Sequence, residues 1–330
     1  MNERVVKWAI AGLGNISHRF VKDLIELPKY SKLYAVASRD EQRAIDFRLK
    51  YGATRSYGSY LELAADPNVD VVYIATIHPF HADLAKIFLE HGKHVLVEKP
   101  AFTKLSDWDE MENIARAKGV LLLEAMKTMT FPAYRRMKDF IKANHIEITS
   151  IEASFGNWHQ FDKNWHLFDP KLSGGATLDV GVYGLWLYAD LCKISNQDLI
   201  KPLVICENDN VESKVDENVR FIFDGKIKGD ICASITRNLS REAVISGPNL
   251  KIVIREKWWN PSLIDILHKG ERFSISEDID GGGFKYEIEH VNDLIINGLA
   301  KSEFLCAKTS REVISVMEDS LMDIDLLVLK

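Results

Sequence analysis

The sequence predicts an α/β chain of two domains, the first a doubly wound parallel sheet and the second an α+β domain with a large, mostly antiparallel open sheet. Three observations support this prediction. The chain has 330 residues, which fits two domains of about 100–200 residues each better than one compact core. Short apolar runs alternate with longer helix-period segments up to residue 125. After about residue 131, strand patterns with hairpin turns replace that alternation.

In the first part, five short runs rich in leucine or β-branched residues suit strands that are buried on both faces. They are Val5–Ala11, Leu33–Ser38, Val71–Thr76, His94–Glu98 and Val120–Glu124. The segments between them with helical spacing are Ile16–Leu27, Glu41–Lys50, His81–His91 and Leu105–Lys118. A strand–helix alternation of this kind implies parallel pairing through right-handed crossovers. We expect residues 1–125 to form this domain.

Residues 126–330 are expected to form the second domain. Pro132 can start a helix that runs to about Ala143. Asp224-Gly225 and Gly247-Pro248-Asn249 each separate two strand-like runs and predict hairpins. The helical patterns in the rest of this part are Ala176–Cys192, Tyr286–Leu299 and Ser310–Leu327.

The composition of the chain argues against some classes of binding partner and site. Apolar residues make up 46% and charged residues 27%, as in an ordinary globular protein. The net charge of −6 argues against a nucleic-acid partner, because a phosphate-binding surface needs clustered cations. The cysteines are widely scattered and form no Cys-x-x-Cys pair, so neither a disulfide framework nor a metal site is expected.

No targeting or membrane segment is visible. Met1–Arg4 runs directly into Val5–Ala11, which is too short for a signal sequence with its cleavage site. No apolar run approaches the roughly 20 residues that span a bilayer. We therefore expect a cytoplasmic protein without a membrane partner.

A glycine-rich turn follows the first predicted strand. Gly12 permits the tight turn, and Gly14 lets backbone amides approach a pyrophosphate. Asn15 and Ile16 open the next helix, whose N-terminus supplies unpaired N–H groups. Ser17 stands where a third small residue is expected. At the start of an alternating strand–helix pattern, this turn predicts a dinucleotide-binding Rossmann domain.

The tip of the second strand bears on the choice between the two nicotinamide dinucleotides. An NAD site usually places a carboxylate there for the ribose 2′-hydroxyl. Here the tip is Ser38-Arg39, a hydroxyl and a guanidinium that suit a 2′-phosphate. Asp40 can still reach the ribose, or it can serve as the N-cap of the next helix. We therefore expect NADP to be preferred, with NAD as the alternative.

Three ordered motifs carry a resemblance to a known family. They are Thr76-Ile77-His78-Pro79-Phe80-His81, the segment Gly92–Pro100 that ends in Glu-Lys-Pro, and Ser173–Tyr183 with its Gly-Gly-x-x-x-Asp-x-Gly-x-Tyr pattern. With them the chain resembles the Gfo/Idh/MocA oxidoreductases over its whole length. Tyr183 and the segment Lys257–Ser262 are most similar to the branch of dimeric dihydrodiol dehydrogenases and glucose–fructose oxidoreductase.

The resemblance implies roles for several residues. Thr76, His78 and His81 would line the cofactor cleft, and Glu98 with Lys99 would lie near the nicotinamide ribose. A cis peptide is expected before Pro100. In the branch an aromatic residue and an arginine usually follow Glu-Ala.

This chain departs from the branch in that segment, where Met126-Lys127-Thr128-Met129 follows Glu-Ala. Lys127 is therefore a candidate for contact with a different substrate. His166 is a further candidate on the substrate side.

The predicted helix Ala176–Cys192 is unusual without any family argument. Its interior glycines, Gly181 and Gly184, each cost about 1 kcal/mol relative to alanine. That cost is usually offset where another chain segment or a ligand comes close. Asp179 and Tyr183 share one face. Trp186 and Asp190 continue this face, which we expect to be a cleft wall beside the apolar core stripe.

Hydride transfer at a carbinol carbon needs a group that takes or gives the hydroxyl proton. A free tyrosine, with a pKa of about 10, is a poor base at neutral pH. A nearby lysine lowers that pKa. We therefore predict Tyr183 as the acid–base group and Lys99 as its activator and substrate contact. Asp179 would orient Lys99 or a substrate hydroxyl. If each residue is considered alone, Tyr183 is more typical of a residue at the edge of the buried helix face, and Asp179 of a surface charge.

These observations predict an NAD(P)-dependent dehydrogenase, with NADP favoured, that acts on a small hydroxylated substrate such as a sugar, polyol or cyclic diol. The alternatives are an inositol- or amino-sugar-type dehydrogenase of the same family and a non-catalytic dinucleotide sensor. A sensor needs the phosphate loop but no proton relay. An antiparallel sheet with one covered face leaves the other free. We therefore expect a homodimer or a dimer of dimers, formed on an apolar sheet face.

Overall fold

The computed structural model describes residues 4–27 and 29–328, so the predicted features of Met1–Glu3 lie outside the described residues. The chain forms two compact units. Met1–Thr130 and Ile279–Ala307 make up unit 1, and Phe131–Asp278 and Lys308–Lys330 make up unit 2. The sequence patterns did not predict that residues 279–307 return to the first unit. No helix in the described ranges is long and apolar enough to cross a membrane.

Unit 1 contains a six-stranded sheet in the order β3-β2-β1-β4-β5-β6, with parallel neighbours throughout. The strands are β1 (Val6–Ala11), β2 (Ser31–Ala37), β3 (Arg55–Tyr57), β4 (Val71–Ile74), β5 (His94–Glu98) and β6 (Leu122–Ala125). The order reverses between β1 and β4, which is the topology of the doubly wound dinucleotide-binding fold. The predicted parallel sheet is confirmed. The short strand β3 was not predicted, because three residues are too few for a period.

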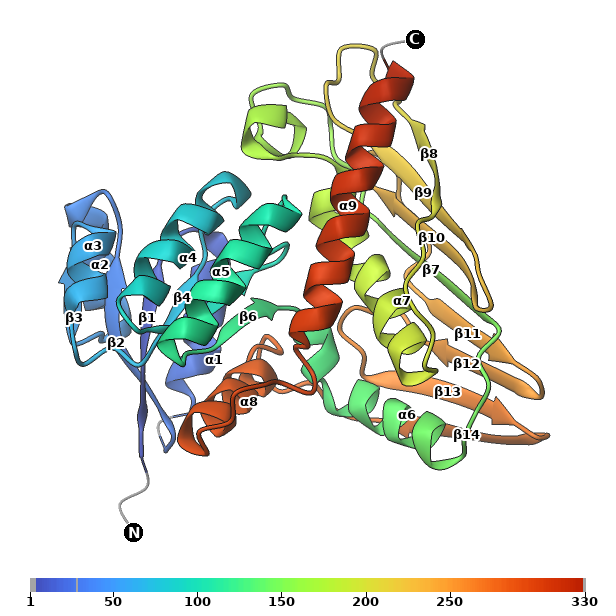
Figure 1. The fold of residues 1–330 in the computed structure, drawn as a ribbon, viewed down its shortest axis with the longest axis horizontal. Coiled ribbons are helices and arrows are strands. Elements are labelled where there is room, and N and C mark those ends of the chain that lie inside the picture. Colours follow the sequence, from blue (N-terminus) through green and yellow to red (C-terminus); the bar gives the residue numbers. More distant parts are fainter. Residues whose placement is uncertain (1–3, 28, 329–330) are drawn as a thin grey trace. The chain divides into compact units, whose positions relative to one another are not determined.

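The helices of unit 1 are α1 (Asn15–Ile25), α2 (Glu41–Tyr51), α3 (Tyr60–Ala65), α4 (His81–Glu90), α5 (Leu105–Lys118) and α8 (Lys285–Ile296) (Figure 1). Helix α8 belongs to the returning segment. The Trp8 indole of β1 donates to Asn292 Oδ1 at 2.9 Å, and Asn292 Nδ2 donates to Ser31 Oγ at 2.6 Å. These buried bonds join α8 to two strands, which explains why this late segment belongs to the first unit.

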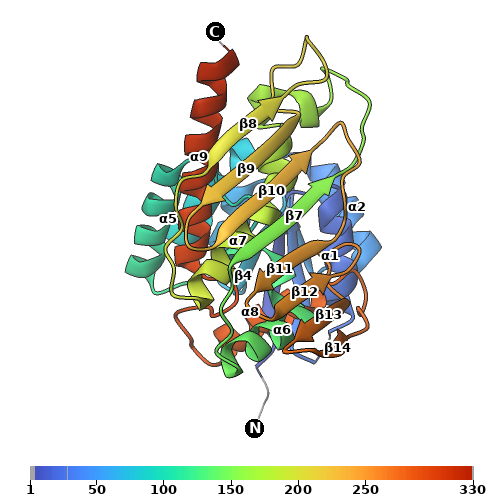
Figure 2. The same cartoon turned by 90° about the vertical axis from the view of Figure 1, so that its right-hand side faces the viewer.

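Unit 2 contains an eight-stranded sheet in the order β14-β13-β12-β11-β7-β10-β9-β8, which Figure 2 shows face on. The strands are β7 (Ser150–Gly156), β8 (Leu203–Glu207), β9 (Asn218–Asp224), β10 (Lys228–Ser234), β11 (Ala243–Gly247), β12 (Leu250–Ile254), β13 (Leu263–His268) and β14 (Glu271–Ser276). All neighbours are antiparallel except β7 and β10. The predicted open sheet and the hairpins β9–β10 and β11–β12 are confirmed.

The helices α6 (Pro132–Ala143), α7 (Val182–Ile194) and α9 (Ala307–Val328) lie on one face of this sheet, and Figure 2 shows the other face without helices. The sequence led us to expect an apolar surface there, and the open face carries both charged and apolar side chains. Side chains there form ion pairs, including Arg220 with Asp230 and Arg255 with Asp265. Outward positions also include apolar side chains, since Leu203 and Ile205 of β8 are exposed and Ile205 lies opposite Arg220. The alternate positions pack on the helices.

Candidate active site

The glycine-rich turn of unit 1 has the geometry that a pyrophosphate needs. Gly12 has φ +92°, and a Cβ there would lie 2.7 Å from Thr76 Cγ2, so the position accepts only glycine. Helix α1 begins directly afterwards, with Gly14 as its N-cap and no side chain capping it. Its first N–H groups therefore remain available to an anion. The predicted cofactor residues Gly12, Gly14, Asn15 and Ile16 fit a dinucleotide phosphate.

The tip of β2 carries cations and a hydroxyl rather than a carboxylate. Asp40 accepts from the backbone N–H of Arg43 at 3.1 Å and caps α2, so the N-cap alternative for this residue is confirmed. The guanidinium of Arg39 lies 5.0 Å from the centre of the Phe80 ring. Ser38 is buried at the strand end and accepts from the Asp40 N–H.

Arg43, which sequence reasoning missed, donates to the carbonyl oxygen of Leu13 in the glycine turn. A cation in the first turn of α2 is a common surface feature. Its contact with the glycine turn depends on the fold and carries no sequence signal.

The segment after β4 contains three predicted cofactor residues with different surroundings. The Thr76 hydroxyl is buried and has no hydrogen-bond partner within the described residues, as expected of a group that awaits a ligand. His81 is fully buried, and burial lowers its pKa. Its ring nitrogens lie 3.0 Å from Thr76 O and 3.1 Å from Pro100 O. His81 therefore links the segment after β4 to the segment after β5. The half-buried His78 ring contacts the His81 ring.

The end of β5 holds Lys99 between buried carboxyl groups. Glu98 accepts from the Tyr73 hydroxyl and from the backbone N–H of Lys99, and burial raises the pKa of Glu98. Glu124, which sequence reasoning missed, accepts from the N–H of Ala101 at 3.0 Å. The Lys99–Pro100 peptide is cis, as predicted. These contacts fix the backbone on both sides of Lys99.

Lys127 lies inside unit 1. Its ammonium donates to Gly282 O at 3.1 Å and sits 4.4 Å from the centre of the Phe284 ring. Burial lowers the pKa of Lys127 to about 8. The Glu287 carboxyl on α8 is fully buried with no hydrogen-bond partner among the described side chains and backbone groups. Burial and the nearby Glu98 raise the pKa of Glu287, which favours the neutral form of its carboxyl.

In unit 2 the expected helix from Ala176 has two parts. Thr177–Gly181 forms a π-helical turn, and α7 follows from Val182. Asp179 lies in the π turn and Tyr183 on the first turn of α7, both half-buried. Single π turns are rare and often occur at functional sites. The sequence, read at a period of 3.6, did not predict this turn.

The continuation of the Asp179–Tyr183 face is not a cleft wall, which corrects the sequence-based expectation. Trp186 and Asp190 are both fully buried. Asp190 pairs with Lys138 of α6 at 2.6 Å and accepts from the Tyr134 hydroxyl at 2.9 Å. Helix α7 is buried from Gly184 to Cys192, and half-buried Tyr183 lies at its start.

The glycines around this helix allow close approach of other segments. A Cβ on Gly184 would lie 2.3 Å from Ile231 Cγ2 of β10, which confirms the expected close packing. A Cβ on Gly175 would lie 2.1 Å from Asp216 Oδ1. The same carboxylate accepts from the Thr177 N–H at 2.6 Å, so Asp216 caps the segment that carries Asp179.

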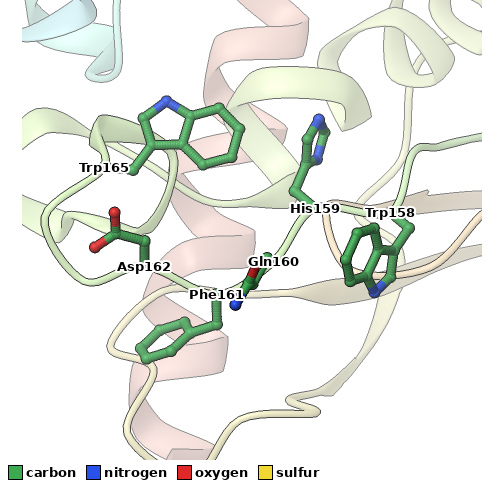
Figure 3. A pocket seen from close by; sticks show the side chains of 6 residues that line it. All are labelled: Trp158, His159, Gln160, Phe161, Asp162 and Trp165. Carbon is green, nitrogen blue, oxygen red and sulfur yellow. The ribbon is translucent and has the colours of Figure 1, made fainter.

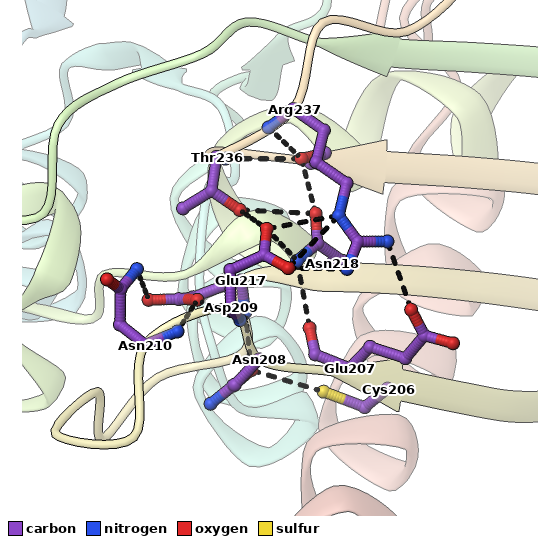
Figure 4. A network of polar contacts seen from close by, with 10 residues as sticks. Cys206, Glu207, Asn208, Asp209, Asn210, Glu217, Asn218, Thr236 and Arg237 are labelled. Atoms are coloured by element: carbon purple, nitrogen blue, oxygen red, sulfur yellow. Dashed lines mark hydrogen bonds and ion pairs between the residues drawn. The ribbon is translucent and has the colours of Figure 1, made fainter.

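A polar network next to Asp216 holds this cap in place (Figure 4). Glu217 is fully buried and accepts from the backbone N–H groups of Asp209 and Asn210. Arg237 in turn forms an ion pair with Asp209. The network joins the loop after β8 to the ends of β9 and β10. It thereby helps to position the π-helical turn that carries Asp179.

An aromatic wall flanks Tyr183. The Phe155 ring at the end of β7 lies 5.4 Å from the Tyr183 ring and stacks on Trp259 with centroids 3.6 Å apart. Neither Phe155 nor Trp259 was predicted as a site residue, because an isolated aromatic residue in a strand pattern usually indicates core. His166 is exposed, and its ring contacts that of Trp165.

The predicted residues thus divide between the units. Unit 1 carries the glycine turn, the Ser38-Arg39 tip and Lys99 at the end of β5. Unit 2 carries Asp179, Tyr183 and His166. Among the residues the structure describes, no three His, Cys, Asp or Glu side chains gather as metal ligands would.

Comparison with known proteins agrees with this architecture. A family model described as "Oxidoreductase family, NAD-binding Rossmann fold" matches residues 6–126. The trans-1,2-dihydrobenzene-1,2-diol dehydrogenase of Xenopus tropicalis is 30% identical over 328 residues, covering 96% of this chain and 98% of that protein.

Solved structures share the fold across both units. A 3-ketoreductase from Actinomadura kijaniata, in complex with NADP and TDP-benzene, matches with a TM-score of 0.81 at 20% identity, over 97% of this chain and 98% of its own. A levoglucosan dehydrogenase in complex with NADH and levoglucosan matches with a TM-score of 0.83 at 16% identity, over 97% of each chain. The chain therefore belongs to the Gfo/Idh/MocA family of NAD(P)-dependent oxidoreductases, as the three sequence motifs predicted.

Proposed function

We propose that this protein is an NADP-preferring dehydrogenase that transfers a hydride between the nicotinamide and a carbinol or carbonyl carbon of a sugar, polyol or cyclic diol. The observation that carries the proposal is Tyr183, a half-buried phenol on the first turn of a helix that is buried from Gly184 to Cys192, beside the Phe155–Trp259 wall. The 30% identity to a diol dehydrogenase supports a hydroxylated substrate.

In this proposal the bound dinucleotide supplies the hydride acceptor or donor, and side chains of the protein handle the proton. Tyr183 takes the hydroxyl proton during oxidation and returns it during reduction. The ammonium of Lys99 stabilises the phenolate and donates to the substrate oxygen. Asp179 orients Lys99 or a substrate hydroxyl. The meeting of Lys99 with Tyr183, which lie in different units, is part of what we propose.

Substitution of Tyr183 by phenylalanine tests the catalytic assignment. We expect turnover to fall by about 10²–10⁴-fold with a panel of aldoses, polyols and trans-diols, because the hydroxyl proton then has no positioned partner. Binding of NADPH should be retained. The exposed Tyr30 of unit 1 provides the control substitution. Near-normal turnover of Tyr183→Phe would show that another group, with Lys99 first, carries the proton.

If the wild-type protein turns over none of the panel yet binds NADPH tightly, the non-catalytic sensor replaces the dehydrogenase. Activity confined to inositols or amino sugars would instead favour the other family alternatives. Lys127 and His166 are the substrate contacts proposed from the sequence. Because Lys127 is buried, we expect its substitution to change stability as well as substrate choice.

The preference for NADP rests on Ser38, Arg39 and Arg43. A 2′-phosphate carries about two negative charges that guanidinium groups neutralise, whereas the NAD ribose hydroxyl usually meets a carboxylate. Asp40 is engaged as the N-cap of α2. We expect a lower dissociation constant for NADPH than for NADH by fluorescence titration, and loss of that difference in Arg43→Ala. Tighter binding of NADH by the wild-type protein would refute the preference.

Assembly and location remain proposals. We propose a homodimer or a dimer of dimers, with the open face of the unit 2 sheet as the interface, in which case its charged pairs lie between copies. Light scattering of the wild-type protein measures the assembly, and a monomer at micromolar concentration would refute it. A cytoplasmic location is proposed from the scattered free cysteines.

A further inference from the structure

A pocket of about 570 Å³ lies in unit 2, in the loop that follows β7. Figure 3 shows its lining, and all of it comes from one short stretch of chain: Trp158, His159, Gln160, Phe161, Asp162 and Trp165. The Trp158 side chain is 61% exposed. An indole left in water at a pocket wall is unusual, since burial of so large an apolar surface is favourable. The site residues described above do not include this pocket.

The pocket is held in a defined shape. The backbone N–H groups of Trp158 and His159 donate to Asn238 Oδ1 at 2.9 Å and to Ile235 O at 3.1 Å. The His159 ring also bonds Ile235 O through Nδ1, at 3.0 Å. Because a carbonyl only accepts, Nδ1 is the donor in this bond. The Trp165 ring lies edge to face against the His159 ring, with centroids 5.1 Å apart.

The pocket is joined to the aromatic wall beside Tyr183. Phe155 is the penultimate residue of β7, and the first pocket residue, Trp158, lies two residues after the strand ends at Gly156. Arg241 connects the two: its guanidinium lies 6.0 Å from the centre of the Trp259 ring, and Nη2 donates to Asn157 Oδ1 at 2.8 Å. A chain of contacts within unit 2 therefore connects Tyr183 to the pocket loop through Phe155, Trp259 and Arg241.

The chemistry of the lining favours a sugar ring. A pyranose has a face of C–H groups, which packs on an indole, and a rim of hydroxyls, which needs paired donors and acceptors. Asp162 accepts from the Asn164 N–H at 2.9 Å, and a carboxylate has further lone pairs to offer. Gln160 supplies a donor and an acceptor together. Both side chains are exposed to water. Sugar hydroxyls can replace the water that they bind, whereas a purely aromatic ring offers no such replacement.

We propose that this pocket is a distal subsite that binds a second pyranose ring, so that the substrate is a disaccharide or glycoside whose other ring is oxidised at Tyr183. The inference rests on the proposed function, which it makes more specific. The distal ring stacks on Trp158 and its hydroxyls bond Gln160 and Asp162.

The test compares one- and two-ring sugars on the full-length protein. Cellobiose, maltose and glucose are titrated against the wild-type protein with NADPH bound, with tryptophan fluorescence as the binding readout, and kcat/KM is measured for each with NADP as oxidant. We expect Trp158→Ala to weaken disaccharide binding and lower the disaccharide kcat/KM by about tenfold. Glucose values should stay unchanged. Phe273→Ala, which removes an exposed aromatic residue from β14, is the matched control.

The outcomes separate the two proposals. Saturable disaccharide binding that Trp158→Ala weakens supports the subsite, even if no sugar is turned over and the proposed reaction fails. If disaccharides bind no better than glucose, or Trp158→Ala and Phe273→Ala behave alike, the subsite is overturned. The proposed dehydrogenase activity is then tested separately, by turnover of the panel of aldoses, polyols and trans-diols. A response to flat aromatic compounds alone would assign the pocket to an aryl group and also overturn the proposal.

Discussion

Substitution of Lys138 by methionine is expected to destabilise unit 2 strongly without changing the chemistry. Lys138 Nζ lies 2.6 and 2.8 Å from the two carboxylate oxygens of Asp190, and the side chains are 6% and 0% exposed. Methionine fills much of the same space but leaves the Asp190 charge, among the described side chains, with the Tyr134 hydroxyl as its remaining hydrogen-bond partner. Removing one member of a buried pair costs about 3–5 kcal/mol. That loss is a large fraction of a typical stability of about 5–15 kcal/mol.

Equilibrium unfolding in urea measures this loss, with circular dichroism and tryptophan fluorescence followed in parallel because the chain has two units. Lys86→Met is the control, since its ion pair with Glu110 is exposed and such pairs contribute little. A double variant in which Asp190 becomes leucine should recover part of the loss, because no buried charge then remains. The kcat of folded Lys138→Met should equal that of the wild type.

Two results would refute this reasoning. A loss below about 1 kcal/mol would mean that water reaches Asp190 and that the pair is not buried. A fall in kcat with unchanged stability would instead support the sequence-based prediction that Asp190 lies in a cleft wall.

Two further substitutions test other packing and charge assignments. Gly184→Ala should lower the free energy of unfolding in urea by about 1–3 kcal/mol, because the new methyl group overlaps Ile231. Helix propensity alone predicts a gain in stability, and such a gain would contradict the close packing. Glu287→Gln should be nearly neutral at pH 7, because the amide resembles the neutral acid. The raised pKa of Glu287 makes wild-type stability fall as pH rises above the unfolded value of about 4.3. The Gln variant should lack that fall, and parallel pH–stability curves for the two proteins would show that Glu287 is ionised.

Much of the fold and the cofactor half of the site could be predicted from local sequence. The Gly12 turn depends on a backbone φ that few residues other than glycine adopt. The spacing of apolar residues along the chain predicts the alternation of strands and helices. The Asp224-Gly225 hairpin is local in the same sense, whereas the cis peptide before Pro100 was expected from the family resemblance. Features of this kind are visible because their physical cause lies within a few residues.

Groups whose role depends on a distant partner were not predictable in that way. The Lys138–Asp190 pair spans 52 positions and the Trp8–Asn292 bond spans 284. Glu287 gives no sign in the sequence that it will be buried near Lys127. The face shared by Tyr183 and Asp190 follows from helix periodicity. Whether each end of that face meets water depends on what packs against it, and α6 covers the Asp190 end.

The sequence by itself determined the fold class, the family and the candidate residues Lys99, Asp179 and Tyr183, because glycine turns, periodicity and ordered motifs are local properties. Only the tertiary structure decided that Tyr183 lies beside Phe155 and Trp259, that Asp190 is a buried structural charge, and that an aromatic pocket follows β7. Burial and contact arise from segments far apart along the chain, and they decide which polar side chain is free to do chemistry.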